Sequence, residues 1–376
     1  MSTGDVSKTC KLNHVLITGG AGFVGKNFVE TLLEQGIKVR SLDREPSPLQ
    51  HKNLEVFTGD IRDPVLIREA VQGVDTIFHT AAIIQTLGGS AATEAFRELS
   101  YDINVEATKQ LVILARAAGV KRFVYTSSNS VVMAGKPLRG ADESAPYSKR
   151  VRDLYTETKL IAEKWILKQN GVDGMLTCAI RPSSIWGPGD QTMFKKMFEQ
   201  LLAGYMLAKI GRASNKLDNS FVHNLIQGQI KAAEHLVEGG TAPGQAYFIN
   251  DNEPINAFQF SKPVFEAVGY KLPKLSIPAK PIINSLTAWE FIHFKFDLPS
   301  PPLAPTDIER VSIDNYFSIK KAQRDLGYEP EYNSKTGMAL SIPYYRELFA
   351  KMQQESEQQS KLVKTPIFPS FARLFG

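Results

Sequence analysis

The first half of the chain alternates short apolar runs with longer segments in which apolar residues recur every three or four positions. The short runs are typical of buried strands, and the longer spacing is typical of amphipathic helices. The runs predict strands at His14–Thr18, Lys38–Asp43, Leu54–Thr58, Asp75–His79, Arg122–Ser127 and Leu176–Ile180. The spacing predicts helices at Phe23–Gln35, Thr93–Ala118 and Asp153–Gln169. Strands that alternate with helices predict a parallel sheet with right-handed crossovers, and therefore an α/β fold.

The pattern changes after Arg181-Pro182, where proline and glycine become frequent and the apolar runs shorten. A helix at Asn224–Leu236 and a strand at Ala246–Ile249 are expected to rejoin the main sheet. We expect a smaller lobe over the carboxyl ends of the strands, where ligands bind in open α/β folds. The predicted parts are a leader at 1–13, a main domain at 14–185 with 224–254, a lobe at 186–223 and 255–350, and a tail at 351–376.

Composition narrows the class of protein. The 376 residues are 43% hydrophobic and 22% charged, and the net charge of +5 is not gathered in one basic run, so nucleic acid is not expected as a partner. Cys10 and Cys178 are too few for a disulfide framework, and no zinc-type spacing occurs, so we expect no metal and a reducing, cytoplasmic location. We find neither a signal peptide nor an apolar run of about 18 residues that would span a membrane.

The segment Thr18–Gly25 joins the first strand to the first helix. Glycines allow a pyrophosphate to approach the backbone closely, and the N–H groups of a helix N-terminus bind it. The strand–loop–helix context is the one that a dinucleotide site requires, although a tight turn is the alternative. We therefore predict a Rossmann-type doubly wound parallel sheet with a smaller C-terminal substrate lobe. The loop residues expected to contact the cofactor are Gly19, Gly22, Phe23, Val24 and Gly25.

Acidic residues end the second and third strands. Asp43 lies 18 residues beyond Gly25, where a carboxylate accepts hydrogen bonds from a ribose and repels a 2′-phosphate. This favours NAD over NADP, although the adjacent Arg44 could bind a phosphate instead. Asp60 and Ile61 end the third strand and either frame the adenine or form a turn.

A tyrosine and a lysine provide the candidate chemistry. The oxidation of an alcohol needs a base, and the pKa of a free tyrosine, near ~10, is too high for that task. An ammonium one helical turn away favours the phenolate, so the spacing Tyr-x-x-x-Lys predicts a tyrosine with a lowered pKa. The spacing occurs at Tyr155/Lys159, Tyr205/Lys209, Tyr270/Lys274 and Tyr316/Lys320.

Position selects the first of these pairs. Tyr155 begins a helix after the fifth strand, and that strand ends at the same sheet edge as the glycine loop. Ser128, at the end of this strand, is expected to hold the substrate oxygen, with Ser127 as the alternative if the strand register differs by one residue. We therefore predict Tyr155, Lys159 and Ser128 as the catalytic residues.

Four motifs in order resemble the extended short-chain dehydrogenase/reductase superfamily. They are Thr18–Gly25, Thr126–Ser128, Tyr155–Lys159 and Arg181–Asp190. Within that superfamily, Tyr155–Lys159, Phe248–Ile255 and Tyr316–Ser318 are similar to the 3β-hydroxysteroid dehydrogenase family. Residues 14–350, including His79–Ile84 and Ser127–Met133, resemble its actinobacterial cholesterol dehydrogenase branch.

This resemblance implies NAD-dependent oxidation of the 3β-hydroxyl of a Δ5 sterol or steroid to the 3-ketone, often with isomerisation from Δ5 to Δ4. It implies the same catalytic trio. The implied NAD contacts are Gly19, Gly22, Gly25, Asp43, Ala81, Tyr155, Lys159, Pro182 and Ser184. The isomerase base stays open. Some vertebrate members have a glutamate where this chain has Ser130, and the substitutes available here are Asp142, Glu143, Asp190 and Tyr155.

The apolar residues of the lobe have two interpretations. They line a sterol pocket or simply form the core of the lobe. The candidates are Trp186, Met193, Phe194, Met197, Phe198, Tyr205 and Ile282–Phe296. The aromatic segment Pro278–Phe296 and the basic, aromatic tail Lys361–Gly376 are compatible with peripheral contact to an anionic membrane, or with a tail that packs on the protein or stays disordered.

Other assignments stay open on the sequence alone. Related enzymes use helices that correspond to Thr93–Ala118 and Asp153–Gln169 as dimer faces, so the resemblance implies a homodimer. The same scaffold serves decarboxylating sterol-4-carboxylate 3-dehydrogenases and nucleotide-sugar epimerases. An epimerase needs a polar pocket, which the aromatic lobe does not favour. A non-catalytic NAD(H)-sensing module is a further alternative, against which the retained tyrosine and lysine argue.

Overall fold

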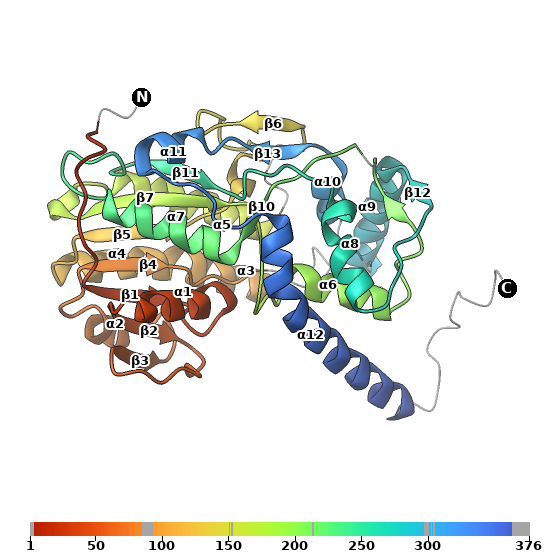
Figure 1. Ribbon diagram of the computed structural model, residues 1–376, viewed down its shortest axis with the longest axis horizontal. Helices are drawn as coiled ribbons and strands as arrows, with labels where there is room; N and C mark the ends of the chain where they lie inside the picture. The colour runs from red at the N-terminus through yellow and green to blue at the C-terminus, as the bar shows by residue number, and fades with distance from the viewer. Residues whose placement is uncertain are drawn as a thin grey trace.

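The centre of the molecule is a parallel sheet of seven strands in the order β11-β7-β5-β4-β1-β2-β3 (Figure 1). The computed structural model describes residues 4–362 apart from 85–92, 150, 152, 213, 297–300, 302 and 304. The strands of the sheet are β1 (His14–Thr18), β2 (Lys38–Asp43), β3 (Leu54–Thr58), β4 (Thr76–His79), β5 (Arg122–Thr126), β7 (Leu176–Pro182) and β11 (Ala246–Ile249). The predicted strands are confirmed to within two residues at each end.

Helices cover both faces of this sheet, as the crossovers predict. On one face lie α1 (Phe23–Glu34), α7 (Val222–Glu234) and α11 (Lys320–Leu326), and on the other lie α2 (Pro64–Ala70), α4 (Thr108–Ala117) and α5 (Leu154–Lys168). Each face has its own core, with Phe28 of α1 in one and Leu111 of α4 in the other, both fully buried. The Rossmann-type fold predicted from the sequence is therefore the fold of the chain.

The long helix predicted at Thr93–Ala118 is interrupted. The structure has α3 (Glu94–Tyr101), a π-helical segment η1 (Asp102–Ala107) and then α4. Within η1, the Asn104 side chain accepts a hydrogen bond from Ile83 N at 2.8 Å and donates to Ile83 O at 3.0 Å and Thr158 Oγ1 at 3.0 Å. The prediction of one continuous α-helix was wrong here. The spacing of apolar residues carries no signal for a π-helical turn, and this turn coincides with the tertiary contact between Asn104 and Ile83.

The smaller lobe follows β7 and has an aromatic core. Its elements are β8 (Ser184–Trp186), α6 (Met193–Leu202), β9 (Lys209–Ile210), β10 (Asn219–Phe221), α8 (Ala257–Ala267), β12 (Ser276–Ile277), α9 (Ala279–Phe296), α10 (Pro305–Ser312) and α12 (Ser334–Leu362). Trp186, Phe194 and Phe198 are fully buried in this core with Phe260 and Tyr345. For these three residues the core interpretation therefore holds.

One part of the predicted lobe belongs to the main domain instead. After α10 the strand β13 (Asn315–Phe317) pairs with β6 (Leu138–Ala141), and α11 follows on the sheet. Ile319 and Leu326 are buried in the same core as α1 and α7. The assignment of all of 255–350 to the lobe was therefore wrong, because a short amphipathic helix carries no sequence signal for which of two cores it joins.

Two short 3₁₀ segments complete the described elements, η2 (Asn129–Val132) after β5 and η3 (Val172–Gly174) after α5. Within the described ranges, no helix combines the length and apolarity that a bilayer crossing requires. The tail at 363–376, which the sequence singled out for its aromatic and basic residues, lies outside the described residues.

Candidate active site

The glycine turn after β1 is built for close approach to its backbone. Gly19 has a φ of +75°, which glycine adopts without the strain that a side chain would add. A Cβ on Gly25 would lie 2.0 Å from Gly19 O, so this glycine is what allows α1 to pack against the turn. No side chain caps the N-terminus of α1 at Gly22, which leaves its first N–H groups for a pyrophosphate. These residues fit a dinucleotide.

Asp43 is placed to define the ribose end of that site. Its Oδ2 atom accepts a hydrogen bond from Ala21 N at 3.0 Å, so the carboxylate lies against the glycine turn. Arg44 points into solvent and makes only a long ion pair of 3.8 Å with Glu45. The negative charge beside the turn therefore favours a free ribose over a 2′-phosphate.

The other expected cofactor contacts lie around the same turn. A Cβ on Gly19 would meet Ala81 backbone atoms at 2.9 Å, which places the loop after β4 directly beside the turn. Asp60 binds Arg62, with 2.6 Å between the carboxylate and the guanidinium, and Ile61 is buried. The turn interpretation of Asp60 thus agrees with its contacts, and its role beside an adenine stays a prediction.

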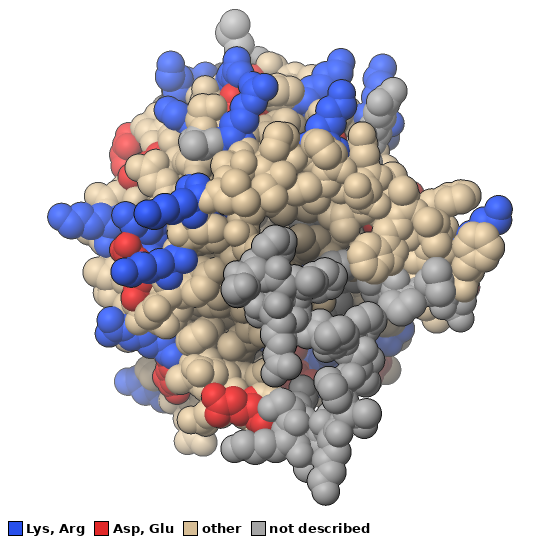
Figure 2. Space-filling model, turned by 90° about the vertical axis from the view of Figure 1, so that its right-hand side faces the viewer, with Lys and Arg blue, Asp and Glu red and all other residues tan. Residues whose placement is uncertain are grey.

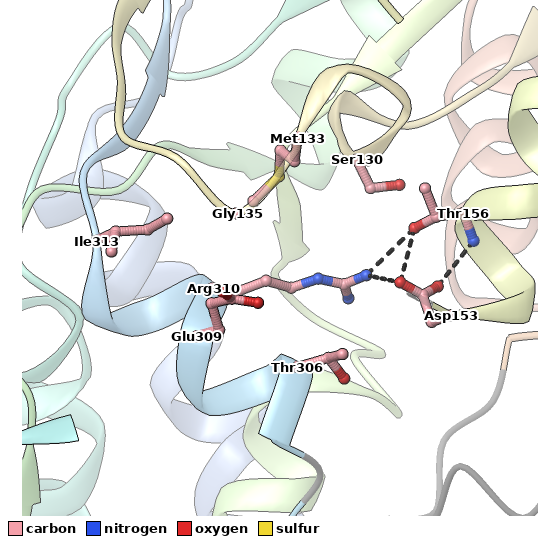
Figure 3. Close-up of a pocket in the computed structure, with 9 residues that line it drawn as sticks. All are labelled: Ser130, Met133, Gly135, Asp153, Thr156, Thr306, Glu309, Arg310 and Ile313. Carbon is pink, nitrogen blue, oxygen red and sulfur yellow. Dashed lines mark hydrogen bonds and ion pairs between the residues drawn. The ribbon is translucent and has the colours of Figure 1, made fainter. Parts of the chain in front are cut away.

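Tyr155 lies in the first turn of α5, where the helix cap fixes its position. Asp153 caps the helix by accepting a hydrogen bond from Thr156 N at 2.8 Å. Arg310 of α10 donates to Asp153 Oδ2 at 2.6 Å and to Thr156 Oγ1 at 3.3 Å. Figure 3 shows this guanidinium reaching from α10 to the start of α5, next to Ser130. The lobe therefore holds the end of the helix that carries Tyr155.

The electrostatics around Tyr155 differ from the sequence prediction. Burial raises the pKa of Tyr155 to about 12, although the Arg310 charge and a hydrogen bond with Ser128 act in the opposite direction. The prediction of a lowered pKa was therefore wrong for the chain by itself, because desolvation outweighs the nearby positive charge. Ser128 and Tyr155 line the same cavity, whereas the Ser127 hydroxyl is buried and has no hydrogen-bond partner among the described residues.

Lys159 lies behind Tyr155 and is almost fully buried. Its Nζ atom donates to Thr126 O at 2.7 Å and lies 4.8 Å from the ring centroid of Tyr125 and 5.9 Å from that of Tyr155. Burial lowers the pKa of Lys159 to about 7, and the charge of Glu163 one turn further along α5 opposes this shift. The ammonium thus lies close to the Tyr155 ring and loses its proton more easily than an ordinary lysine.

His79 is buried at the carboxyl end of β4, and the sequence predicted no role for it. Its ring bonds Thr18 Oγ1 at 2.6 Å and Thr108 Oγ1 at 2.8 Å, and it stacks on Tyr125. Burial, followed by the charge of Lys159, lowers the pKa of His79 to about 3, so the imidazole is neutral. This neutral histidine, at the end of β4, therefore joins the end of β1 and the start of α4 by hydrogen bonds and contacts β5 by ring stacking.

A cavity of about 290 Å³ opens in front of Tyr155. This volume lies near the lower end of the roughly 300–1,000 Å³ that is usual for small-molecule sites. Ser128, Pro182 and Ser184 line it, and so do the charged residues Lys196, Asp218 and Arg310 and apolar side chains from both the main domain and the lobe. These apolar residues are Ile84, Met133, Ile185, Met193, Leu217 and Val311. A smaller cavity of about 40 Å³ adjoins it and shares Ser130, Met133 and Arg310 (Figure 3).

Known proteins resemble the chain over nearly its whole length. A model of the 3-beta hydroxysteroid dehydrogenase/isomerase family matches residues 16–279. A 3 beta-hydroxysteroid dehydrogenase/Delta 5-->4-isomerase of Mycobacterium tuberculosis is 56% identical over 357 residues, which cover 95% of this chain and 96% of the relative. The chain belongs to the 3-beta hydroxysteroid dehydrogenase/isomerase family.

Two solved structures have the same fold as this chain. The epimerase Mth375 of Methanothermobacter thermautotrophicus superposes with a TM-score of 0.72 at 21% identity, and the match covers 93% of this chain and 96% of that one. A short-chain dehydrogenase/reductase superfamily protein from Agrobacterium tumefaciens, solved with bound NAD, superposes with a TM-score of 0.65 at 20% identity, covering 93% and 100%. At these identities the likeness concerns the fold alone.

The structure of this steroid dehydrogenase family member also places the acids that the sequence offered for isomerisation. Asp142 is bonded to Ser144 in an exposed turn. Glu143 accepts a hydrogen bond from Phe248 N at 2.8 Å, and Asp190 caps α6 through three backbone N–H groups. None of these acids is among the residues that line the 290 Å³ cavity, whereas Ser130 is.

The sequence interpretation missed Arg310 and Asp218, which both line that cavity. Neither has a sequence signal, since each is a single charged residue outside any motif. Among the described residues, no group of three or more His, Cys, Asp or Glu side chains is arranged to hold a metal ion.

Proposed function

We propose that this chain uses NAD to oxidise the 3β-hydroxyl of a Δ5 steroid or sterol to the 3-ketone, and that it also isomerises the product to the Δ4 ketone. The observation that supports this most directly is the arrangement of Tyr155, Ser128 and Lys159 beside a cavity whose lining combines apolar side chains with polar and charged ones. Membership of the 3-beta hydroxysteroid dehydrogenase/isomerase family agrees with it. A steroid is a rigid apolar body with one polar end, which suits a cavity of this kind.

Each catalytic side chain has a role that follows from its contacts. Tyr155 accepts the proton of the substrate hydroxyl, and Ser128 orients the substrate oxygen through the same hydrogen-bond network. Lys159 favours the phenolate by its charge, and Glu163 helps to keep that charge by opposing the effect of burial on the lysine pKa. Arg310 adds a second positive charge that lowers the pKa of the phenol.

The cofactor site follows from the turn and the strand ends. Gly19, Gly22 and Gly25, with the backbone of Phe23 and Val24, would hold the pyrophosphate at the start of α1. Asp43 would bind the adenosine ribose, and Pro182 and Ser184 would flank the nicotinamide beside Tyr155. Bound NAD supplies the hydride acceptor and a positively charged ring next to the phenol.

The test is a direct assay of the purified protein. With NAD and a 3β-hydroxy-Δ5 steroid we expect NADH to form, followed by absorbance of the conjugated enone. The matched control is the 3α-hydroxy epimer of the same steroid, which presents its hydroxyl to the other side and should react far more slowly. Equal rates with both epimers, or no NADH with either, would remove the proposed activity.

The same assay separates the two alternative enzymes. A sterol with a 4-carboxylate is the second substrate to compare, because Lys196 and Arg310 also line the cavity and offer positive charges for that carboxylate. Release of CO₂ at a rate above that of 3β-hydroxy-Δ5 oxidation would favour the decarboxylating dehydrogenase instead. Turnover of a nucleotide sugar would favour an epimerase.

We also propose peripheral contact with an anionic membrane through α9. Phe291 and Phe296 of this helix are 64% and 61% exposed, and Lys295 Nζ lies 5.5 Å from the Phe296 ring. Figure 2 shows this end of the molecule, with a broad uncharged area, Lys and Arg side chains mainly above and to the left of it, and a few Asp and Glu side chains among them. Sedimentation with anionic vesicles should fall for Phe291→Ser/Phe296→Ser and not for Val65→Ser, whose side chain is 59% exposed on α2. Equal sedimentation of all three proteins would contradict membrane contact by α9.

A homodimer through α4 and α5 is the remaining part of the proposal. Ile113 of α4 is 48% exposed, so it lies on the outer face of one of these two helices. Analytical ultracentrifugation should give a dimer for the natural chain and a monomer for Ile113→Asp. A monomer at all concentrations of the natural chain would exclude the dimer.

A further inference from the structure

One polar part of the 290 Å³ cavity has no role in the oxidation. It is formed by Asp218 and Asn315, with Leu217 beside them. Asp218 directly precedes β10, whose Asn219 pairs in parallel with Ser184 of β8. Asp218 is therefore held next to the Pro182–Ser184 segment that we propose for the nicotinamide, in the cavity that Tyr155 also lines.

The carboxylate of Asp218 is buried, and one of its two oxygens accepts no hydrogen bond from the described residues. The residue is 3% exposed, and its Oδ2 atom accepts hydrogen bonds from Phe317 N and from Asn250 Nδ2, the latter at 3.1 Å. The Oδ1 atom has no hydrogen-bond partner among the described residues. A buried carboxylate oxygen without a donor costs free energy, so the fold alone does not account for it.

Other buried acids of the chain are satisfied within the fold. Asp251 accepts hydrogen bonds from Phe221 N at 2.7 Å, Asn224 Nδ2 at 2.7 Å and Trp186 Nε1 at 2.9 Å. Asp190 caps α6 through backbone N–H groups of 2.7 to 3.0 Å. Among the described residues that line the larger cavity, Asp218 is the one carboxylate.

We propose that Asp218 is the acid–base residue of the isomerisation, which takes the proton from C4 of the bound 3-oxo-Δ5 steroid and returns it to C6. This inference rests on the proposed function and names the residue for its second step. Asp218 Oδ1 forms the bond to the C4 proton, and the electron pair of the broken C–H bond moves to give a dienolate with its charge on the C3 oxygen. Tyr155 and Ser128 stabilise that oxygen. The acid then protonates C6, so that C4=C5 replaces C5=C6 with no oxidant and no net proton change.

The environment of Asp218 suits a group that works in both directions. Burial, and then the charge of Asp251, raises the pKa of Asp218 to about 7. A carboxyl with a pKa near the working pH is a stronger base than an ordinary aspartate and still gives its proton back. A raised carboxyl pKa beside an oxyanion held by hydrogen bonds is a known arrangement for moving a proton next to a ketone.

The decisive experiment measures the two steps separately on Asp218→Asn. The asparagine keeps an oxygen for Phe317 N and Asn250 Nδ2 and removes the base. NADH formation from a 3β-hydroxy-Δ5 steroid reports the first step, and enone absorbance from a 3-oxo-Δ5 steroid supplied directly, with NADH present, reports the second. We expect isomerisation to fall by about 100-fold or more, the usual effect of removing a general base, and to fall much further than NADH formation.

Glu143→Gln is the matched control, because Glu143 is a carboxylate that accepts a hydrogen bond from Phe248 N but does not line the cavity. It should keep the natural ratio of the two rates. Equal losses of both steps in Asp218→Asn, or a loss of isomerisation in Glu143→Gln as large as in Asp218→Asn, would overturn the assignment. If Asp218→Asn does not fold, Asp218→Glu keeps the acceptor oxygens and displaces the base, and the same comparison of the two rates applies.

The two proposals fail in different ways. A natural enzyme that forms no NADH would remove the proposed dehydrogenase function. A natural enzyme that forms NADH but does not speed the rearrangement of the supplied ketone above the rate in buffer would overturn the role of Asp218 and leave the dehydrogenase in place.

Discussion

Glu163 holds three groups in the buried space behind Tyr155 and Lys159. Its carboxylate accepts hydrogen bonds from Arg181 Nη2 at 2.6 Å and Tyr147 OH at 2.8 Å, and its charge acts on Lys159. Glu163 and Arg181 are 0% and 4% exposed, so neither charge is solvated by water. This ion pair fixes α5 to β7 and thereby fixes the lysine in the site.

We therefore expect Glu163→Gln to lower the free energy of unfolding strongly. Removing one partner of a buried pair leaves the other charge unsatisfied and costs about 3–5 kcal/mol. The control is Glu30→Gln, which removes an exposed pair with Lys26 at 4.0 Å and should cost roughly 0–1 kcal/mol. Urea unfolding of both variants measures the difference. Similar midpoints for the two would show that the Glu163–Arg181 pair does not anchor the helix.

At the scale of single residues, the sequence predicted the parts of the site that lie within one motif. Tyr155 and Lys159 are four positions apart on one helix, and Ser128 lies two residues after a strand whose place in the sheet follows from the alternating pattern. Asp218 and Arg310 could not be found in this way. Each reaches the cavity through contacts with residues about 100 or more positions away, such as Phe317 and Asp153, which no local pattern records.

The junction of β1 and α1 is the element on which cofactor binding depends. Gly25 is needed for packing, since a Cβ there would lie 2.0 Å from Gly19 O. Gly22 has an ordinary φ of −72°, and a Cβ there would meet only Gly19 O, at 3.2 Å. The two glycines of one motif therefore have different physical reasons to be glycine.

This difference predicts different outcomes for two alanine variants. Gly22→Ala should fold with nearly the natural melting temperature but bind NAD at least about tenfold more weakly, because its methyl group projects where the pyrophosphate approaches. Gly25→Ala should lose both stability and NAD binding, because the helix must move. Thermal unfolding and NAD titration by fluorescence separate the two. Natural NAD affinity in Gly22→Ala would place the pyrophosphate elsewhere.

The contact between α10 and α5 brings a charge from the lobe to the catalytic helix. Arg310 is 37% exposed and lowers the pKa of Tyr155. Arg310→Ala should therefore raise that pKa, so that less phenolate is present at a given pH and the pH profile of kcat/KM for NADH formation moves to higher pH. We expect a loss of roughly 2- to 5-fold at fixed pH, the size expected of a partly exposed charge.

Arg310→Lys tests whether the charge or the shape of Arg310 matters. A lysine keeps the charge and loses the fork that binds Asp153 and Thr156, so it should restore most of the rate if the effect is electrostatic. Added salt should then reduce the difference between the natural chain and Arg310→Ala. An unchanged pH profile in Arg310→Ala would show that Arg310 only positions α5.

Helix and strand predictions succeeded where local pattern and packing agree. The inner strands β1, β4 and β7 are buried along nearly their whole length, and their apolar runs gave their bounds from the sequence. The π-helical turn at Asp102–Ala107 did not, because the hydrogen bonds of Asn104 to Ile83 join two segments that are separated by 21 residues.

In the molecule as a whole, the sequence predicted the architecture of the main domain but only part of the architecture of the lobe. The alternation of strands and helices has few compatible topologies, and the observed strand order is one of them. The lobe consists of short elements, and β13 and α11 return from it to the sheet. Its apolar residues divide between core and cavity: Phe194 is fully buried, while its neighbour Met193 lines the cavity. Only the assembled structure separates these roles.

The central claim is that the phenol of Tyr155 takes the proton in a steroid dehydrogenase. The most direct test is Tyr155→Phe, which removes one oxygen atom from the cavity wall. NADH formation from a 3β-hydroxy-Δ5 steroid should fall by about 100-fold or more, while NAD affinity and melting temperature stay close to those of the natural chain. NADH formation at the natural rate in this variant would contradict the account.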